Sequence, residues 1–464
     1  MNSFSPTEDT IAAIATAVSP GQGSIAVIRI SGSSAIEISK NIVHIPGMHK
    51  WSTHKVLYGH VTEANEEKYI DEVLILIMEG PRSFTGEDVV EIHCHGGIIS
   101  VQKILERLLD SPNIRRAEPG EFSQRAVLNG RLSLTQAESI SELISARSRK
   151  AAELALNGIE GNIQTTIQTI RQRLLEQLTE IEARIDFEED LPNLEEKNVK
   201  NEIYKIRKDI HELIENSKRG SWVRSGLKVA LIGKPNVGKS SLMNRLSKKE
   251  KAIVTELPGT TRDLLESEIV LEGIPLTFTD TAGIRKTENI IEQIGITRTQ
   301  KALQQTDLVI LIFDYSNGWN KEDESILKLI PKSIPILFVG NKSDLKDIHS
   351  SVKEQELILE KENLVIMSAR TGEGEEELIN YLLKFCGSSE IHGLDIALNE
   401  RQLDLAKLAM KSLKQIDKVF DEKLPWDFWT IDLRQAINHL GELAGDDLTE
   451  NLLDNIFSKF CIGK

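Results

Sequence analysis

The sequence predicts a protein that combines α/β and all-α architecture. We expect an N-terminal α/β domain, a helical domain, and a doubly wound, mostly parallel sheet inserted into the helical domain. Three observations predict this organisation. The 464 residues exceed what one hydrophobic core normally organises. Apolar, strand-like runs between residues 227 and 367 end in polar loops, and long helical patterns stand on both sides of them. The expected segments are residues 1–122 (α/β domain), 123–224 and 387–464 (two parts of the helical domain) and 225–386 (inserted domain).

The first segment shows the short alternating runs that are typical of strands. We expect strands at residues 24–30, 56–62, 71–78 and 88–94. In the last of these, strand alternation places Cys94 on the opposite face from His93 and His95, which leaves too few ligands on one face for a metal site. The run at residues 19–24 is similar to a dinucleotide-binding loop, but it precedes a strand and lacks the third glycine, so we expect a tight turn.

Two helical blocks surround the inserted sheet. From about Leu134 to Phe187, apolar residues recur at steps of three to five, which predicts helices that pack along a stripe. This stripe consists of Leu154, Ile159, Ile163, Ile167, Ile170, Leu174 and Leu178. A second block runs from Asn399 to the end with an interruption at residues 424–429, and neither block hides its apolar face alone. Residues 218–226 and 387–393 are expected to connect the helical domain to the inserted one.

The most informative motif is Gly233-Lys-Pro-Asn-Val-Gly-Lys-Ser240, which has the P-loop spacing and follows the strand-like run 227–232. Gly233 and Gly238 allow the backbone to wrap around phosphate groups, whose charge then faces backbone N–H groups and the N-terminus of the next helix. Lys239 is expected to reach the terminal phosphates, and Ser240 to bind Mg²⁺. The motif predicts a nucleoside triphosphate site.

Three further motifs each follow an apolar run. They are Asp280-Thr-Ala-Gly283, Asn341-Lys-Ser-Asp344 and Ser368-Ala-Arg370, and a doubly wound sheet holds its ligand at such strand ends. A carboxylate such as Asp344 accepts hydrogen bonds from both the N1–H and the 2-amino group of guanine, a donor pair that adenine lacks. Asn341 and the backbone of Ala369 would complete the guanine pocket. This set resembles the Ras-like GTPases of the translation-factor class, so we expect GTP as the ligand.

The expected GTP-binding residues are spread over these motifs and one further loop. They are Gly233, Asn236, Val237, Gly238, Lys239, Ser240, Ser241, Thr255, Glu256, Leu257, Pro258, Gly259, Thr260, Thr261, Asp280, Thr281, Ala282, Gly283, Asn341, Lys342, Asp344, Ser368, Ala369 and Arg370. Ile284 stands where Ras carries the glutamine that orients the attacking water. Because isoleucine cannot polarise water, another group must supply a contribution comparable to an arginine finger, which is worth about 10³ to 10⁵ in rate.

Asn236 and the loop Thr255-Glu-Leu-Pro-Gly-Thr-Thr-Arg-Asp263 resemble the bacterial tRNA-modification GTPase family called MnmE or TrmE. The resemblance implies that K⁺ takes the place of the arginine finger. Its implied ligands are Asn236, Thr255, Leu257 and Thr260, while Thr261 joins Ser240 on Mg²⁺. Oxygen ligands suit such hard cations. The water-orienting glutamate of the family corresponds to Glu292, which from sequence alone would be a solvated helix residue.

The segments at residues 84–91, 95–97 and 117–131 resemble the N-terminal domain of the same family. The resemblance implies an N-terminal domain that forms homodimers and binds a tetrahydrofolate derivative, in its 5,10-methylene or 5-formyl form. The implied folate-binding residues are Arg29, Glu91, Arg131 and Lys464. A carboxylate suits the N–H donors of a pterin, and arginine suits its carbonyl or the folate tail. Without the resemblance, Arg29 and Glu91 would be an ordinary strand arginine and an edge carboxylate.

The chain ends in Cys461-Ile-Gly-Lys464, which matches the terminal signature of the family and identifies Cys461 as the candidate for uridine chemistry. Thiolate addition at C6 of uridine is a common route to substitution at C5, and Lys464 would favour the thiolate. Two other interpretations remain. The sequence has the outline of a prenylation box with poorly fitting residues, and terminal residues are often merely mobile.

The resemblance covers nearly the whole chain and implies a potassium-dependent GTPase that modifies C5 of the wobble uridine, position 34, of certain tRNAs. It would add an aminomethyl or carboxymethylaminomethyl group with a partner that carries FAD, as a heterotetramer. The main alternative is a ribosome-assembly GTPase that acts as a switch without base chemistry. A membrane-remodelling GTPase is a distant third, because no lipid anchor or strongly basic amphipathic helix is present.

The net charge of −15 argues against a protein that coats nucleic acids, since such affinity comes from clustered Lys and Arg. We expect local contacts with tRNA and none with DNA. The candidate patches are Arg115, Arg116, Arg125 and Arg131, and Arg147, Arg149 and Lys150, although such charge runs are more often solvated faces.

Targeting signals and membrane spans are not evident in the sequence. The apolar runs 73–78 and 308–313 are too short to span a bilayer. The N-terminus lacks a cleavable leader pattern, and the three cysteines form no disulfide framework. We therefore expect a cytoplasmic protein without membrane contact.

Overall fold

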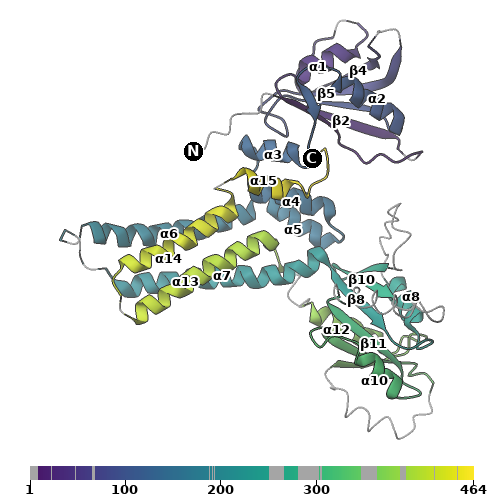
Figure 1. Cartoon of the computed structure of the whole chain (residues 1–464), viewed down its shortest axis with the longest axis vertical. Coiled ribbons are helices and arrows are strands. Elements are labelled where there is room, and N and C mark those ends of the chain that lie inside the picture. The colour runs from purple at the N-terminus through teal and green to yellow at the C-terminus, as the bar shows by residue number, and fades with distance from the viewer. Residues whose placement is uncertain are drawn as a thin grey trace. The chain divides into compact units, whose positions relative to one another are not determined.

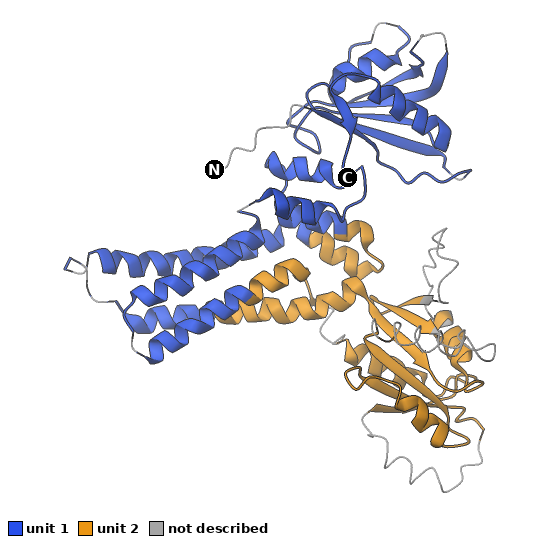
Figure 2. Cartoon of the chain, viewed as in Figure 1, with its two compact units in different colours: residues 1–141, 158–206, 408–464 blue, residues 142–157, 207–407 orange. Residues whose placement is uncertain are grey.

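The computed structural model describes residues 9–249, 266–280, 303, 306–345, 363–386 and 393–463, except residues 22, 48, 65–67, 188, 191, 193, 423 and 447. The chain divides into two compact units, shown in blue and orange in Figure 2. Unit 1 comprises residues 1–141, 158–206 and 408–464, and unit 2 comprises residues 142–157 and 207–407. The domain boundaries expected from the sequence stay a prediction.

Unit 1 begins with a seven-stranded sheet in the order β3-β4-β5-β6-β2-β1-β7 (Figure 1). The strands are β1 (Thr10–Ile14), β2 (Ile25–Ser31), β3 (Val43–His44), β4 (Lys55–Thr62), β5 (Tyr69–Met78), β6 (Val89–His95) and β7 (Ile114–Arg116). Neighbours pair antiparallel, except that β1 and β7 run parallel. The four strands expected from the sequence are confirmed, whereas β1, β3 and β7 were not predicted.

The two faces of this sheet differ in their exposure. Helices α1 (Ala35–Ile42) and α2 (Ile98–Leu109) pack with the buried residues of one face into a single apolar core. On the other face Tyr58 pairs with Leu74, and Leu74 pairs with His93. Tyr58 is 48% exposed and Leu74 is 47% exposed. Because the outer face of an antiparallel sheet is normally polar, these exposed apolar residues are unusual.

The helices that follow build the rest of unit 1 and continue into unit 2. They are α3 (Glu121–Leu128), α4 (Leu134–Ser145), α5 (Arg149–Ile159), α6 (Asn162–Asp186), α7 (Glu196–Ser225), α13 (Glu400–Asp421), α14 (Asp427–Ala444) and α15 (Glu450–Phe457). Ion pairs of Arg171 with Asp446 and of Arg434 with Glu182 show that α6 and α14 run antiparallel. The expected stripe is confirmed on α6, where Ile163, Ile167, Ile170, Leu174 and Leu178 are all buried.

Unit 2 contains a six-stranded sheet in the order β13-β12-β11-β8-β10-β9. Its strands are β8 (Leu227–Ile232), β9 (Glu266–Leu271), β10 (Ile274–Asp280), β11 (Leu308–Asp314), β12 (Ile336–Asn341) and β13 (Leu364–Ile366). The described helices beside it are α8 (Lys239–Lys249), α10 (Lys321–Leu327) and α12 (Glu375–Phe385). All strands run parallel except β9, which forms a hairpin with β10. Successive residues of β11 are buried in two different apolar clusters, so both faces are covered, as in a doubly wound sheet.

The first expected connection to the inserted sheet is helical. Residues 218–225 complete α7, and only Gly226, with a φ of 74°, turns the chain into β8. Within α7, a Cβ on Gly220 would lie 2.3 Å from the Cβ of Ala397, so the glycine allows close packing. Residues 218–226 thus lead from α7 directly into β8, in helical conformation up to Ser225. The second expected connection lies mostly outside the described residues.

Leu154 belongs to a different core from the rest of the predicted stripe. Together with Ala151 on α5, it lies in one apolar cluster with Ile269, Leu271 and Ile274 of the β9–β10 hairpin. The first part of α5 is thus a structural component of unit 2, packed against the hairpin. Periodicity predicts which face of a helix is buried, but not which core buries it.

Replacing Leu154 by alanine should destabilise unit 2 by about 2 to 5 kcal/mol, because it leaves a cavity in this core. Leu154 is 3% exposed, whereas Leu156 on the same helix is 47% exposed and provides the matched control. Urea unfolding of the full chain, with hydrogen exchange of peptides from β9 and β10, measures the effect. If the Leu154→Ala and Leu156→Ala variants had the same free energy of unfolding and the same hydrogen exchange, α5 would not be part of this core.

Within the described part of the chain, no helix is long and apolar enough to cross a membrane.

Candidate nucleotide site

The P-loop connects the end of β8 to the start of α8 and depends on two glycines. A Cβ on Gly233, which has a φ of 156°, would lie 2.2 Å from the carbonyl oxygen of Ile312. A Cβ on Gly238, which has a φ of 102°, would lie 2.2 Å from Nδ2 of Asn341. Both positions therefore require glycine for steric as well as conformational reasons. The backbone of the loop can turn tightly here and present its N–H groups to an anion.

Lys239 is the first residue of α8 and lies beneath the loop. Its ammonium group donates to the carbonyl oxygens of Gly233 and Lys234, each at 2.8 Å, and the residue is 6% exposed. Asn236 has a φ of 63° and is exposed at the crest of the loop. Asparagine adopts this left-handed conformation more readily than most residues. The start of the helix adds Ser240 and Ser241, which are both exposed. The first N–H groups of a helix have no carbonyl partner within the helix and can face an anion.

Asn341 at the end of β12 joins the P-loop to the loop that follows β13. Its Nδ2 donates to the carbonyl oxygen of Val237 at 2.7 Å, and its Oδ1 accepts from the N–H of Ala369 at 2.8 Å. The side chain is 3% exposed. In this structure Asn341 therefore links these two loops, and its expected contact with a base stays a prediction.

Asp344 lies three residues after the end of β12, and the protein holds one of its carboxylate oxygens. The hydroxyl of Ser368 donates to Oδ1 at 2.6 Å, while the exposed guanidinium of Arg370 lies 3.8 Å from Oδ2. Ser368 is fully buried and also accepts from the N–H of Thr371 at 3.1 Å. The carboxylate is thus oriented by a buried hydroxyl and keeps acceptor capacity for guanine.

Lys342 has a partner that the sequence analysis missed. Its Nζ donates to Oδ2 of Asp314, at the end of β11, at 2.7 Å. Burial acts to raise the pKa of Asp314, but hydrogen bonds from Lys342 and Ser316 outweigh it and hold the pKa below its ordinary value. The position of Asp314 at the end of an apolar strand could have indicated this role, because residues there lie at the edge of the sheet where ligands bind.

The ends of β8, β10, β11, β12 and β13 lie at one edge of the sheet, since these strands are parallel. The structure therefore brings the described parts of the expected nucleotide motifs together. Of Asp280 only the backbone, at the end of β10, is described. The expected residues Thr255, Glu256, Leu257, Pro258, Gly259, Thr260, Thr261, Thr281, Ala282, Gly283, Glu292 and Lys464 lie outside the described residues.

A second group of expected residues meets in unit 1. Arg29 on β2 and Glu91 on β6 are register partners, and Nε and Nη2 of Arg29 each lie 2.9 Å from Oε1 of Glu91. The rings of Phe84 and Phe122 lie 5.3 and 5.7 Å from the guanidinium carbon. Nε2 of His93 lies 3.4 Å from the second oxygen of Glu91. This cluster presents charged groups in a partly aromatic setting.

Known proteins match this chain along its full length. The family described as GTP-binding protein TrmE N-terminus matches residues 10–131, and the family described as MnmE helical domain matches residues 134–461. A protein of Prochlorococcus marinus strain NATL2A, named tRNA modification GTPase MnmE, is 81% identical over 464 residues, which is 100% of both chains. A protein of the same name from Synechococcus sp. strain CC9605 is 55% identical over 459 residues, 99% of this chain and 100% of the relative. The chain belongs to the MnmE family.

Two further residues named from the sequence, Arg131 and Cys461, are both exposed. Arg131 is exposed, and no interaction among the described residues joins it to Arg29 or Glu91. Cys461 is exposed near the end of the chain, whereas burial raises the pKa of both Cys94 and Cys386 to about 12. Cys461 is therefore the accessible thiol of this MnmE protein.

Two of the four arginines in the first candidate RNA patch of this MnmE protein, Arg115 and Arg125, are held in ion pairs. Arg125 is 3% exposed and pairs with Glu121 and Asp9 at 3.0 Å and with Glu87 at 3.3 Å. Arg115 pairs with Asp9 and Glu121 at 2.6 and 2.7 Å. The expectation that Arg125 contacts RNA was wrong, because the side chain is buried in the protein. Arg147 and Lys150 of the second patch pair with Glu268 and Glu153.

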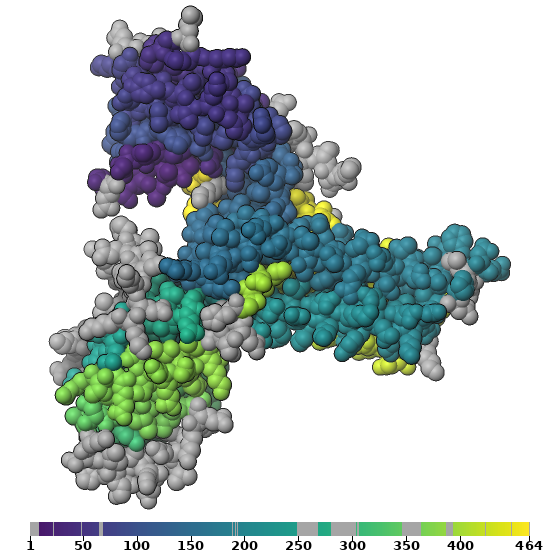
Figure 3. Space-filling model, turned by 180° about the vertical axis from the view of Figure 1, so that it is seen from behind, coloured from purple at the N-terminus to yellow at the C-terminus, as the bar shows by residue number. Residues whose placement is uncertain are grey.

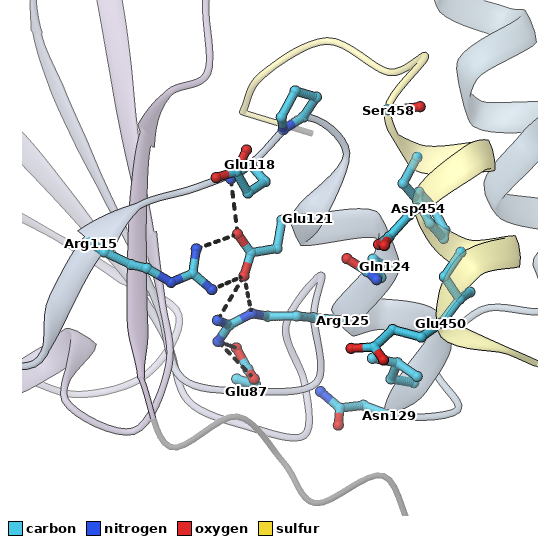
Figure 4. Close-up of a pocket in the computed structure, with 14 residues that line it drawn as sticks. Glu87, Arg115, Glu118, Glu121, Gln124, Arg125, Asn129, Glu450, Asp454 and Ser458 are labelled. Atoms are coloured by element: carbon cyan, nitrogen blue, oxygen red, sulfur yellow. Dashed lines mark hydrogen bonds and ion pairs between the residues drawn. The ribbon is translucent and has the colours of Figure 1, made fainter.

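The same ion pairs form one wall of a cavity of about 530 Å³ that sequence reasoning did not predict. Figure 4 shows Glu121 between the two guanidinium groups of Arg115 and Arg125, with Glu450 and Asp454 of α15 across the cavity. Segments more than 300 residues apart in the sequence thus meet here in the MnmE fold. Local sequence patterns do not predict such a contact.

Proposed function

We propose that this chain binds and hydrolyses GTP and takes part in modifying C5 of the wobble uridine of certain tRNAs. The geometry of the P-loop supports GTP binding, because Gly233, Gly238 and Lys239 shape a loop that can surround phosphate groups. Asn341 links this loop to Ala369 in the loop that follows β13. Membership of the MnmE family, whose curated relatives are named tRNA modification GTPases, supports the tRNA part. It also favours this function over a ribosome-assembly switch.

For the ions, we propose Mg²⁺ on Ser240 and Thr261, and K⁺ on Asn236, Thr255, Leu257 and Thr260. Mg²⁺ and K⁺ would neutralise charge that develops on the phosphates during hydrolysis. The exposed position of Asn236 in the phosphate loop supports this, because its side chain is accessible to an ion bound at the phosphates. Glu292 is proposed to orient the attacking water.

For the one-carbon chemistry, we propose a tetrahydrofolate derivative at Arg29 and Glu91, with Arg131 and Lys464, and a partner protein that carries FAD. The carboxylate and guanidinium of this pair match the donors and acceptors of a pterin ring. Cys461 is proposed as the thiolate that attacks C6 of the uridine, since it is the accessible cysteine of the chain.

We further propose that the chain forms a homodimer through the N-terminal sheet. The apolar residues exposed on its outer face include Ile25, Val56, Tyr58 and Leu74, at 66%, 61%, 48% and 47%. Large apolar residues exposed on one sheet face are typical of a surface that another protein covers. Arg29 and Glu91 lie on the same face, by strand register.

Mass spectrometry of tRNA nucleosides from cells with and without the gene tests the proposed function. Deletion should remove a C5-substituted wobble uridine, and the wild-type gene should restore it. An unchanged nucleoside profile would contradict the proposed role in tRNA modification. In parallel, GTP turnover by the purified chain should be faster in potassium chloride than in sodium chloride at equal ionic strength. Equal rates in the two salts would remove the proposed K⁺ site and leave the nucleotide site intact.

A further inference from the structure

The C-terminal segment of unit 1 is anchored at two points on either side of Cys461. The first anchor is Phe460, which is 9% exposed and packs with its ring 5.0 Å from that of Phe457. Both rings belong to an apolar cluster with Val127 and Leu134. In Figure 3, yellow atoms of the C-terminal residues are visible next to blue atoms of the helices that follow the N-terminal sheet.

The second anchor is Gly463, which is buried against the end of β1. It has a φ of 93°, and a Cβ there would lie 2.6 Å from the carbonyl oxygen of Ile14 and 2.8 Å from the Cα of Ala15. Both the conformation and the space at this position therefore require glycine. Cys461 and Ile462 form an exposed arch between the two anchors.

Arg29 holds the second anchor in place. Its Nη1 donates to the carbonyl oxygen of Gly463 at 3.3 Å, while Glu91 occupies the other side of the guanidinium. The guanidinium is oriented by this carboxylate and by the ring of the fully buried Phe122. A planar guanidinium can satisfy both contacts at once because its donors point in fixed directions.

We propose that Arg29 is a positioning residue for Cys461. Through the carbonyl oxygen of Gly463 it fixes the C-terminal segment against β1, so that the thiol stands at a set distance from the Arg29–Glu91 pair. Because consecutive Cα atoms are about 3.8 Å apart, Cys461 lies within roughly 13 Å of the guanidinium. One side chain thereby ties the proposed folate site to the proposed nucleophile. This inference rests on the proposed function for its chemical meaning, but the docking of the segment does not depend on it.

A nitroxide spin label on Cys461 of the full-length chain tests the docking. Labelling is selective, because the two remaining cysteines are buried. The wild-type spectrum should show an immobilised component that Gly463→Ala and Arg29→Lys each remove, the first by steric clash and the second because an ammonium group cannot span both acceptors. Gly97→Ala is the matched control, since no heavy atom lies within 4 Å of a Cβ at that position.

Unlabelled protein tests the positioning. In Gly463→Ala the kcat for tRNA modification should fall while the KM for tRNA and the rate of GTP hydrolysis match those of Gly97→Ala. A label that stays immobilised in Gly463→Ala would overturn the docking, and one that stays immobilised in Arg29→Lys would overturn the role of Arg29. A released label with unchanged kcat would overturn the positioning role. Absence of modification by the wild-type chain would contradict the proposed function, and the spin-label comparison would still decide the docking.

Discussion

Replacing Asp344 by asparagine is expected to weaken GTP binding about 100-fold, or about 3 kcal/mol, because one charge-assisted hydrogen bond is lost and a second donor faces the 2-amino group of guanine. The structure indicates how the new amide would lie. The hydroxyl of Ser368 donates to Oδ1 of Asp344 at 2.6 Å, so the amide oxygen would keep this partner and the NH₂ group would take the other position.

The same substitution should improve binding of xanthosine triphosphate. Xanthine carries a carbonyl group where guanine has its 2-amino group, so an amide offers one acceptor for N1–H and one donor for that carbonyl. Competition of GTP and xanthosine triphosphate for a fluorescent nucleotide bound to the full chain measures both affinities.

Glu373→Gln provides the matched control for Asp344→Asn. It makes the same change from carboxylate to amide in the neighbouring loop, where Glu373 accepts from the hydroxyl of Ser343 at 3.1 Å. The control should leave both affinities unchanged. If Asp344→Asn retains its preference for GTP, Asp344 does not read the base and the proposed guanine pocket is wrong.

The nucleotide site was predictable because its signals are local. Each described motif follows a short strand. The strands β8, β11 and β12 were recognisable from apolar runs, and β10 from apolar alternation. The linking role of Asn341 was not predictable, since it depends on Val237 and Ala369, which come from other loops. Motif spacing indicates that a residue matters, but not which groups it bonds.

The contacts of unit 1 were harder to predict because they join distant parts of the chain. Arg29 and Gly463 are 434 positions apart, and no pattern in either segment indicates their hydrogen bond. Arg115 and Arg125 suggested a basic patch in the sequence, yet their partners Asp9 and Glu87 come from other segments of the fold. Net charge along a segment thus predicts little about the charge that a folded surface presents.

Replacing Arg125 by alanine is expected to destabilise unit 1 by about 3 kcal/mol, at the lower end of the range for removing one partner of a buried ion pair. Glu121 is 6% exposed, and it would keep Arg115 as a partner while losing Arg125. Arg116→Ala, which removes an exposed arginine from β7, is the matched control. Chemical unfolding of the full chain, with hydrogen exchange of peptides from α3, measures the loss.

The pH dependence of the difference in unfolding free energy between wild type and Arg125→Ala provides a second test. Burial acts to raise the pKa of Glu121, but hydrogen bonds from Arg115, the N–H of Glu118 and Arg125 outweigh it and hold the pKa below 4.5. A lowered pKa means that the network stabilises the fold above the ordinary pKa and that this stability is lost as the pH falls through the folded-state pKa. The difference between wild type and Arg125→Ala should therefore be largest near neutral pH and shrink once Glu121 becomes protonated, since a neutral carboxyl group no longer requires a cation. A difference that is constant from neutral pH into the acid range would mean that Arg125 stabilises unit 1 by packing rather than by its charge.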